Sequence, residues 1–445
     1  MIDSVINILS LTGLIGGFAI KTEGRNFLIY TLVFLLIPLA ASVKGFTLYE
    51  IAFIFIFLFI IIESLGIYSV ATVRFYDSSR ILIYYLLFVL SLIISISFSL
   101  YVSSISLLSC LKASFPFLLL TLLLRFKFNF GTKQKKYLLW ALVLAGFAIS
   151  VKCILLVIGS GYLFINPMVG KSGTPFNSAL YLFIIPFFLV LFFYEKKKSL
   201  KLILGILFFL FTWRFLIDFR RHALFIYLFS IILVIYFSKF QYDYWKVLQS
   251  KLKVVLPFGI IFILLIVGWE GAKLIKELNM QSLVHRLSFQ SILLGLKTRF
   301  ALDFKAWDYF WNNPFFGVGI GKNPKLYGVV NQAFLTGASK LHRSYSVSKV
   351  HNLYLFILMN GGLVLFIPFG LFIANLFKKL KFLIKKVALE PVDFYWCIGS
   401  IIFLINYLIL GIFSVKTISL EAWLVLGIVS GITMSIYAKY KLRYK

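Results

Sequence analysis

A histidine at the start of an apolar run is the residue best placed to carry chemistry. His351 is followed by Asn352 and directly follows a strongly basic loop. Histidine is the side chain best suited to accept a proton near neutral pH. The start of a helix also offers backbone N–H groups and a favourable dipole to an anion. A lone histidine here could instead be an interfacial polar residue, but its position next to the basic loop favours proton transfer beside an anionic group.

The loop before His351 could bind an anion. Segment 271–350 holds eleven Lys and Arg residues against three acidic residues, a net charge of +8. Its arginines are Arg286, Arg299 and Arg343. Attraction to anionic lipid head groups is the alternative explanation for this charge. An anionic ligand bound by the loop is the functional interpretation, since guanidinium groups match phosphate geometry well.

A second cationic cluster lies at 214–222. It contains Arg214, Asp218, Arg220, Arg221 and His222. Arg214 precedes Asp218 by four residues, so the two can pair on one helix face. Arg220 and Arg221 then remain for a ligand, because charges at membrane depth are functional candidates. The alternative is that these long side chains snorkel to the membrane interface.

The composition shows which elements must position these residues. Of the 445 residues 61% are hydrophobic and 13% are charged, whereas a soluble domain carries about twice that charge. Apolar runs of about 17–25 residues match the thickness of a bilayer core, and such runs must be helical. The sequence therefore predicts an all-α polytopic membrane protein. Its net charge of +30 is explained mostly by basic cytoplasmic loops, not by nucleic acid.

The runs divide the chain into three regions. We expect an N-terminal helix bundle over 1–269, one long outer, periplasmic loop over 270–350, and further spans with a basic cytoplasmic tail over 351–445. The count is 12 spans if the first run lies in the interface and 13 if it crosses. The runs are 4–20, 27–43, 47–70, 81–101, 104–124, 137–159, 177–194, 202–219, 222–238, 254–269, 351–376, 394–414 and 421–437.

A glycine-rich stretch, Pro314–Gly321, lies inside the outer loop. It lacks the spacing of a dinucleotide fingerprint and a βαβ context, so we expect a glycine turn packed on the membrane surface. Nearby aromatic residues suit an amphipathic segment at the interface, namely Trp307, Tyr309, Phe310 and Trp311. The sequence also contains no Asp-x-Asp pair, no P-loop, no nucleophile elbow and no His-Cys metal cluster, which argues against redox and ATP-driven chemistry, and we expect no cofactor.

Together these motifs resemble the O-antigen ligase/polymerase superfamily. The resemblance covers about 210–375 and rests on Arg299, Trp307, Asn313-Pro314, Gly317, Gly319, His351-Asn352 and Gly361-Gly362-Leu363. The family also tends to carry a Ser-Arg-small motif at the outer end of an earlier span. Arg220-Arg221-His222 is similar to that motif but departs from it at two of its three positions.

The resemblance implies a metal-independent glycosyltransferase with a GT-C-like helical fold in the bacterial inner membrane. Its donor would be an undecaprenyl-diphosphate-linked oligosaccharide, used at the periplasmic face. The periplasm has no nucleotide sugars, so a donor there must arrive already activated on a lipid. In this hypothesis Arg220, Arg221 and Arg299 hold the diphosphate and His351 accepts the proton of the acceptor hydroxyl. Arg214, Arg286 and Arg343 are further diphosphate candidates.

Three functions remain open at this stage. A polymerase would pass the glycan to another lipid-linked repeat unit, making O-antigen or a related surface polysaccharide. A ligase would pass it to lipid A-core in lipopolysaccharide biosynthesis. We favour the polymerase, because the departure at Arg220 is from a motif that ligases commonly keep. The third is a lipid-linked oligosaccharide flippase or transporter. Expected partners are the donor, a glycan acceptor, membrane lipids and a chain-length regulator protein.

Overall fold

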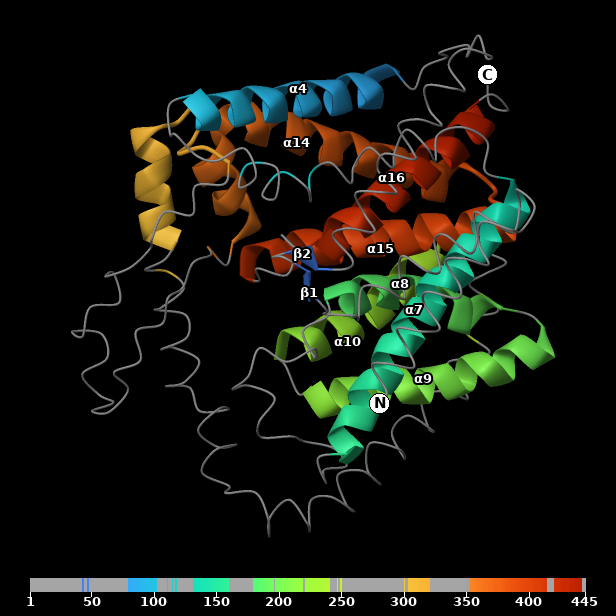
Figure 1. The fold of residues 1–445 in the computed structure, drawn as a ribbon. Helices are drawn as coiled ribbons and strands as arrows, with labels where there is room; N and C mark the ends of the chain where they lie inside the picture. Colours follow the sequence, from blue (N-terminus) through green and yellow to red (C-terminus); the bar gives the residue numbers. More distant parts are fainter. Residues whose placement is uncertain are drawn as a thin grey trace.

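The computed structural model describes an α-helical bundle (Figure 1). Residues described are 42–43, 46–47, 79–101, 110, 114, 117, 131–159, 179–195, 197–218, 221–240, 246, 249, 300, 303–320, 350, 352–413 and 420–441. Two short strands, β1 (Ser42–Val43) and β2 (Phe46–Thr47), pair antiparallel where the sequence predicts the connection between two apolar runs.

The helices coincide with the predicted apolar runs. They are α4 (Ser79–Tyr101), α7 (Thr132–Gly159), α8 (Ala179–Tyr194), α9 (Lys198–Asp218), α10 (Arg221–Ser238), α14 (Leu353–Lys386), α15 (Pro391–Phe413) and α16 (Leu420–Lys441). Four segments within them are long and apolar enough to cross a bilayer: Ile83–Tyr101, Leu353–Lys386, Pro391–Ile412 and Ala422–Lys441. Few or no described residues lie in runs 4–20, 27–43, 47–70, 104–124 and 254–269, so the total of 12 or 13 spans stays a prediction.

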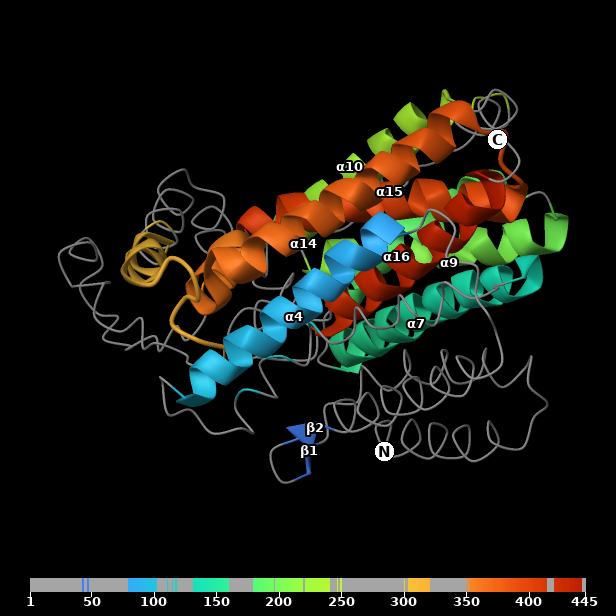
Figure 2. The ribbon, with the colours of Figure 1, turned by 90° about the horizontal axis from the view of Figure 1, so that it is seen from above.

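Helices α8 and α15 form the centre of the bundle. Helix α8 packs against α7, α10 and α15, while α15 also contacts α14 and α16. Helix α14 runs along α4, as both views show (Figures 1 and 2). The core is rich in aromatic side chains, and Trp396, Trp423 and Tyr407 are among the largest fully buried ones. Large aromatic groups fill the space between helices and dominate the packing energy there.

Several polar residues inside the bundle are satisfied locally. Some of the buried serines donate to the carbonyl four residues earlier, as Ser230 does to Ile226 and Ser430 to Leu426. This bond lets a hydroxyl sit in an apolar helix without an unpaired proton. Other buried bonds join two helices; for example, Asn406 Nδ2 donates to Ser230 Oγ at 2.7 Å and links α15 to α10. Hydrogen bonds of this kind hold helices together where no hydrophobic effect acts between them.

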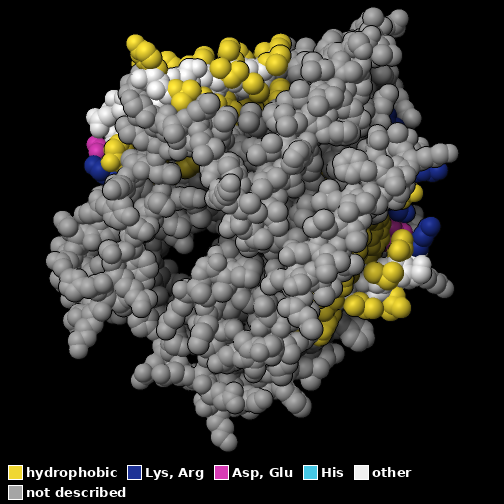
Figure 3. Space-filling view, in the orientation of Figure 1, with side chains coloured by type: hydrophobic (Ala, Val, Ile, Leu, Met, Phe, Trp, Pro, Cys, Tyr) yellow, Lys and Arg dark blue, Asp and Glu magenta, His cyan; other side chains and the backbone are white. Residues whose placement is uncertain are grey.

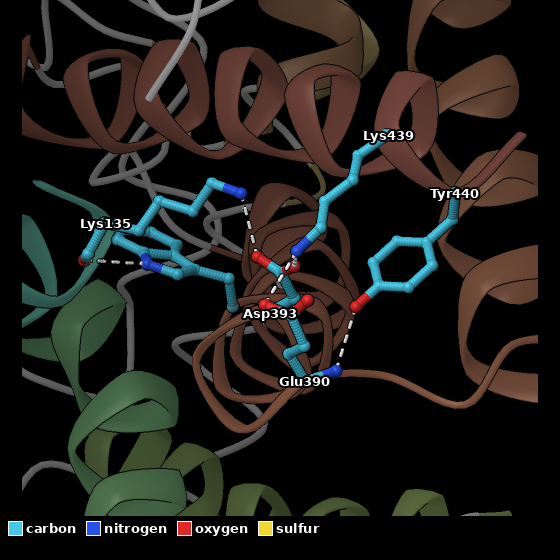
Figure 4. Close-up of polar contacts among 6 residues, drawn as sticks. Lys135, Glu390, Asp393, Lys439 and Tyr440 are labelled. Carbon is cyan, nitrogen blue, oxygen red and sulfur yellow. Dashed lines mark hydrogen bonds and ion pairs between the residues drawn. The ribbon is translucent and has the colours of Figure 1, made fainter. Parts of the chain in front are cut away.

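One end of the bundle contains ion pairs of Lys135 and Lys439 with Glu390 and Asp393, and we call it the lysine-rich end; Figure 4 shows these contacts. The carboxylate of Asp393, which is 1% exposed, accepts hydrogen bonds from Lys135 Nζ and Lys439 Nζ, each at 2.8 Å. Lys439 also pairs with Glu390 at 2.8 Å. Two cations therefore face two anions, a balance that a buried charge requires. The cluster ties the start of α7, the start of α15 and the end of α16 to one another.

Helix boundaries at the lysine-rich end differ from the predicted ones. The basic residues 133–136 are the first turn of α7, where the sequence suggested a loop, and 378–386 continue α14 as helix. Helix α14 has 34 residues, more than the roughly 20 that cross a bilayer core of about 30 Å. Local hydropathy predicts where a helix enters lipid. It does not predict where the hydrogen-bonded helix ends.

Helix α4 presents a broad apolar face to the outside. Ile83, Leu86, Leu90 and Ile93 are exposed along it, and this face forms the hydrophobic band at the top of Figure 3. A contiguous exposed patch of aliphatic side chains is rare on a soluble protein. On a helix of this length it is what a lipid-facing span requires.

Candidate functional site

Two glycine-containing segments more than 35 residues apart in sequence meet at the end of the bundle opposite the lysines. The first is 313–320, and the second is 359–364 in α14; together we call them the glycine junction. The Val318 amide donates to the Met359 carbonyl at 2.7 Å. The Leu363 and Val364 amides donate to the carbonyls of Pro314 and Phe315 at 2.9 and 3.1 Å. The two segments are therefore joined by hydrogen bonds between their backbones.

The glycine junction exists because α14 is broken inside it. Gly362 has φ 60° and ψ −162°, which is not helical. In an unbroken helix the Leu363 amide would donate to the Met359 carbonyl, four residues earlier. Here the loop supplies a new partner to each group: Pro314 to the Leu363 amide and Val318 to the Met359 carbonyl. Backbone groups freed by a helix break near lipid need such replacement partners.

Glycine is required at three positions of the junction. Gly317, Gly319 and Gly362 all have positive φ, a region that L side chains rarely adopt. A Cβ on Gly362 would overlap the Phe315 carbonyl, and one on Gly317 would overlap the Met359 carbonyl. Both residues therefore allow two backbones to approach closely. The sequence suggested a glycine turn packed on the membrane surface, which stays a prediction; the structure shows that Gly317 and Gly319 are buried against α14 and α4.

The loop is also fixed to its neighbours beyond α14. Gly319 lies against Ser99 at the end of α4, and the ring of Phe316 stacks on Phe98 with centroids 5.3 Å apart. The Cys110 thiol donates to the Ile320 carbonyl at 3.3 Å. The junction thus joins α4, α14 and residue 110 around one loop.

A small buried cluster brings together the neighbours of the two predicted catalytic positions. It consists of Ala306, Val318, Val350 and Met359, with Tyr309 and Leu355 packed against it. Ala306 lies on the helical segment that follows position 299, and Val350 immediately precedes position 351. The helical segment after position 299 and the residue before position 351 therefore share one core with the glycine junction.

Asn352 begins α14. It has extended backbone angles, and its Oδ1 accepts from the amides of Tyr354 and Leu355 at 3.0 and 3.2 Å. Asparagine is a preferred N-cap, because its side chain satisfies amides that lack a partner in the helix. This confirms the predicted helix start at Asn352. The side chain of Tyr354 then reaches the Leu408 carbonyl of α15 at 2.9 Å.

The predicted catalytic and binding side chains are not themselves described. Arg220, Arg286, Arg299, Arg343 and His351 lie outside the described residues. The backbone of Arg214 lies in the last part of α9, and Arg221 begins α10, but their side chains lie outside the described part as well. The roles assigned to all seven residues stay predictions, as does the Arg214–Asp218 pair.

Among the described residues, few charged side chains lie near the glycine junction. On the helical segment 303–312, Lys305 Nζ donates to Asp308 Oδ2 at 2.9 Å and lies 5.3 Å from the Tyr309 ring centroid. The hydrogen bond from Lys305 to Asp308, and the charge of that carboxylate, raise the pKa of Lys305. Among the described residues no three His, Cys, Asp or Glu side chains gather as metal ligands would.

Sequence reasoning missed the break in α14. The signal was present as Asn360-Gly361-Gly362, since two successive glycines in an apolar helix weaken it. The partner of the break could not be read from the sequence, because it lies more than 35 residues away.

No protein-family model matches the chain, and no curated protein matches it in sequence.

Proposed function

We propose that this protein is a metal-independent membrane glycosyltransferase that polymerises lipid-diphosphate-linked oligosaccharide repeat units at the outer face of the bacterial inner membrane. The observation that supports this best is the shared core of Ala306, Val318, Val350 and Met359. It joins the segment after Arg299 to the residue before His351. A reaction that needs a cation and a base at one place requires such a convergence.

The proposed reaction is a direct displacement at the anomeric carbon of the donor sugar. The oxygen of the acceptor hydroxyl forms a bond to that carbon as the bond from carbon to diphosphate oxygen breaks. The lipid diphosphate leaves with the bonding electron pair, and the hydroxyl proton passes to the imidazole of His351. The arginines stabilise the charge that develops on the leaving diphosphate, Arg299 foremost and then Arg220 and Arg221.

The orientation that we propose follows from the two ends of the bundle. Lys135, Lys385 and Lys439 lie at the end where α7 and α15 begin and α14 and α16 finish. Basic residues gather on the cytoplasmic side of membrane proteins. The glycine junction, at the other end, then faces the periplasm, where a lipid-linked donor is the available form of activated sugar.

Reconstitution tests the reaction. Purified protein in liposomes receives a synthetic lipid-diphosphate repeat unit, and product length is measured on a gel. We expect His351→Ala to lower turnover by about 10²–10⁴-fold, the usual contribution of a general base. Arg299→Ala should lower it by about 10²–10³-fold through lost stabilisation of the leaving group. The matched control is Asn312→Ala, an exposed residue of the same region, with unchanged turnover expected.

The outcome of this assay separates the alternatives. Polymer formation at wild-type rate in both variants would contradict the proposed roles. Transfer to lipid A-core without chain extension would identify a ligase. Movement of the donor across the membrane with no new glycosidic bond would identify a flippase. In cells, deletion of a polymerase leaves single capped repeats, whereas deletion of a ligase leaves polymer on its lipid carrier.

A further inference from the structure

A stripe of aromatic side chains covers one outer face of the segment that precedes the glycine junction. Phe300, Phe304, Trp307 and Trp311 are 59, 73, 40 and 61% exposed. Their spacing of four, three and four residues places them on one side of a helix. We call these four residues the aromatic stripe. A solvent-facing helix in a loop has no need of four large exposed rings.

The opposite side of the same segment is used for packing. Ala306 and Phe310 are buried there, and Ala306 belongs to the cluster under the glycine junction. The sequence assigned Phe310 and Tyr309 to an interfacial face together with Trp307 and Trp311. The structure corrects this: Phe310 is buried and Tyr309 is half-buried, whereas Phe300 and Phe304 complete the exposed face.

A polar strip borders the aromatic stripe. Asp308 and Asn312 are exposed one helical turn apart, and Lys305 pairs with Asp308. The exposed surface is thus divided lengthwise into an aromatic part and a charged part. This division is characteristic of a helix that lies in the membrane interface, with its rings among the acyl chains and its charges in water.

The stripe lies next to a surface that already faces lipid. The loop that follows it places Phe316 on Phe98 of α4, and α4 exposes Ile94 and Leu100 toward the same end. Side chains on the outer face of a membrane span contact acyl chains. Because the stripe is continuous with this face of α4, we expect it to contact acyl chains as well. A carbohydrate platform is less well matched, since half of the stripe is Phe, which cannot hydrogen-bond a sugar.

We propose that the aromatic stripe inserts into the phospholipid leaflet at the glycine-junction end of the bundle and holds the segment 303–312 in the membrane interface. The segment then has a membrane on one face and the buried cluster on the other. The insertion therefore fixes the glycine junction at the depth of the lipid head groups. This proposal does not depend on glycosyl transfer.

Photo-crosslinking tests the insertion directly. The photoreactive residue p-benzoyl-phenylalanine replaces Phe304 or Trp311, an aromatic-for-aromatic exchange that the exposed sites tolerate. Controls carry the same residue in place of Asp308 or Asn312, on the polar strip. Each variant is reconstituted in vesicles of phospholipid alone, containing an alkyne-tagged phosphatidylethanolamine. We expect lipid adducts at 304 and 311 to exceed those at 308 and 312 at least severalfold.

Adduct mass distinguishes the other occupants. Equal lipid labelling at all four positions would overturn the proposal. A doubled protein mass at 304 or 311 would show that the stripe contacts a second copy of the chain and would overturn it as well. So would adducts that form only after a polyprenyl diphosphate is added, because the stripe would then bind the donor lipid. Melting of each variant in detergent verifies that the fold is intact.

Discussion

At the scale of single residues, Gly317 and Gly362 determine the candidate site. Each lies in a backbone region reserved for glycine, and each brings its backbone against a carbonyl of the other segment. Neither residue has a side chain that could react. Their role is to allow a loop to replace the hydrogen bonds that α14 loses at its break.

Replacing Gly362 with alanine should disrupt the glycine junction. The φ and ψ of Gly362 cost a non-glycine residue about 1–3 kcal/mol, and the new Cβ overlaps Phe315. We expect a lower melting temperature in detergent, and turnover in the liposome assay reduced about 100-fold by misplacement of the site. Gly370→Ala is the matched control on the same helix, where nothing lies within 4 Å of the new Cβ. Equal melting of the two variants would contradict the role of the break.

At the scale of elements, α14 consists of two helical segments whose join depends on a distant loop. Asn352 starts the first segment, and the second continues to the lysine-rich end. The break near Gly362 would be costly by itself, since it leaves backbone groups unpaired beside lipid. With 313–320 inserted, those groups are paired and the loop is held on α4 as well. The loop and the helix therefore stabilise each other.

This mutual dependence predicts non-additive variants. Gly317→Ala and Gly362→Ala damage the same junction from its two sides, so the second change should add little once the first has separated the segments. We expect the loss of melting temperature in the double variant to be clearly smaller than the sum of the single losses. Gly205→Ala on α9 meets nothing within 4 Å and serves as an independent change whose effect should add normally. Full additivity of the junction pair would argue against a shared structure.

At the scale of the whole molecule, the bundle has two unlike ends. The lysine-rich end is held by a balanced group of charges around Asp393, and the opposite end by backbone contacts at the glycine junction. Charge holds helix termini together at one end, and at the other end glycine backbone geometry holds the loop 313–320 against α14 and α4. Between the two, aromatic packing around Trp396 and Trp423 fills the core.

Removing the central anion should weaken the lysine-rich end. Asp393→Asn leaves Lys135 buried without a charged partner, and breaking such a pair costs about 3–5 kcal/mol. We expect a clear drop in melting temperature, with the orientation of the protein in the membrane unchanged. Asp308→Asn, which removes the partner of exposed Lys305, is the control and should melt like the wild type. Similar melting of both variants would mean that the buried cluster does not stabilise the bundle.

The sequence by itself determined the membrane class, the placement of eight helices and the helix start at Asn352. These features depend on hydropathy and capping, which act within a few residues. Only the tertiary structure decided that α14 is broken, that the glycine turn fills the break, that Asp393 joins two lysines and that Phe310 faces inward. Those outcomes depend on contacts between residues far apart in the chain. Such contacts have no local signature, because an unpaired backbone group or buried charge can be satisfied by any segment that folding brings to it.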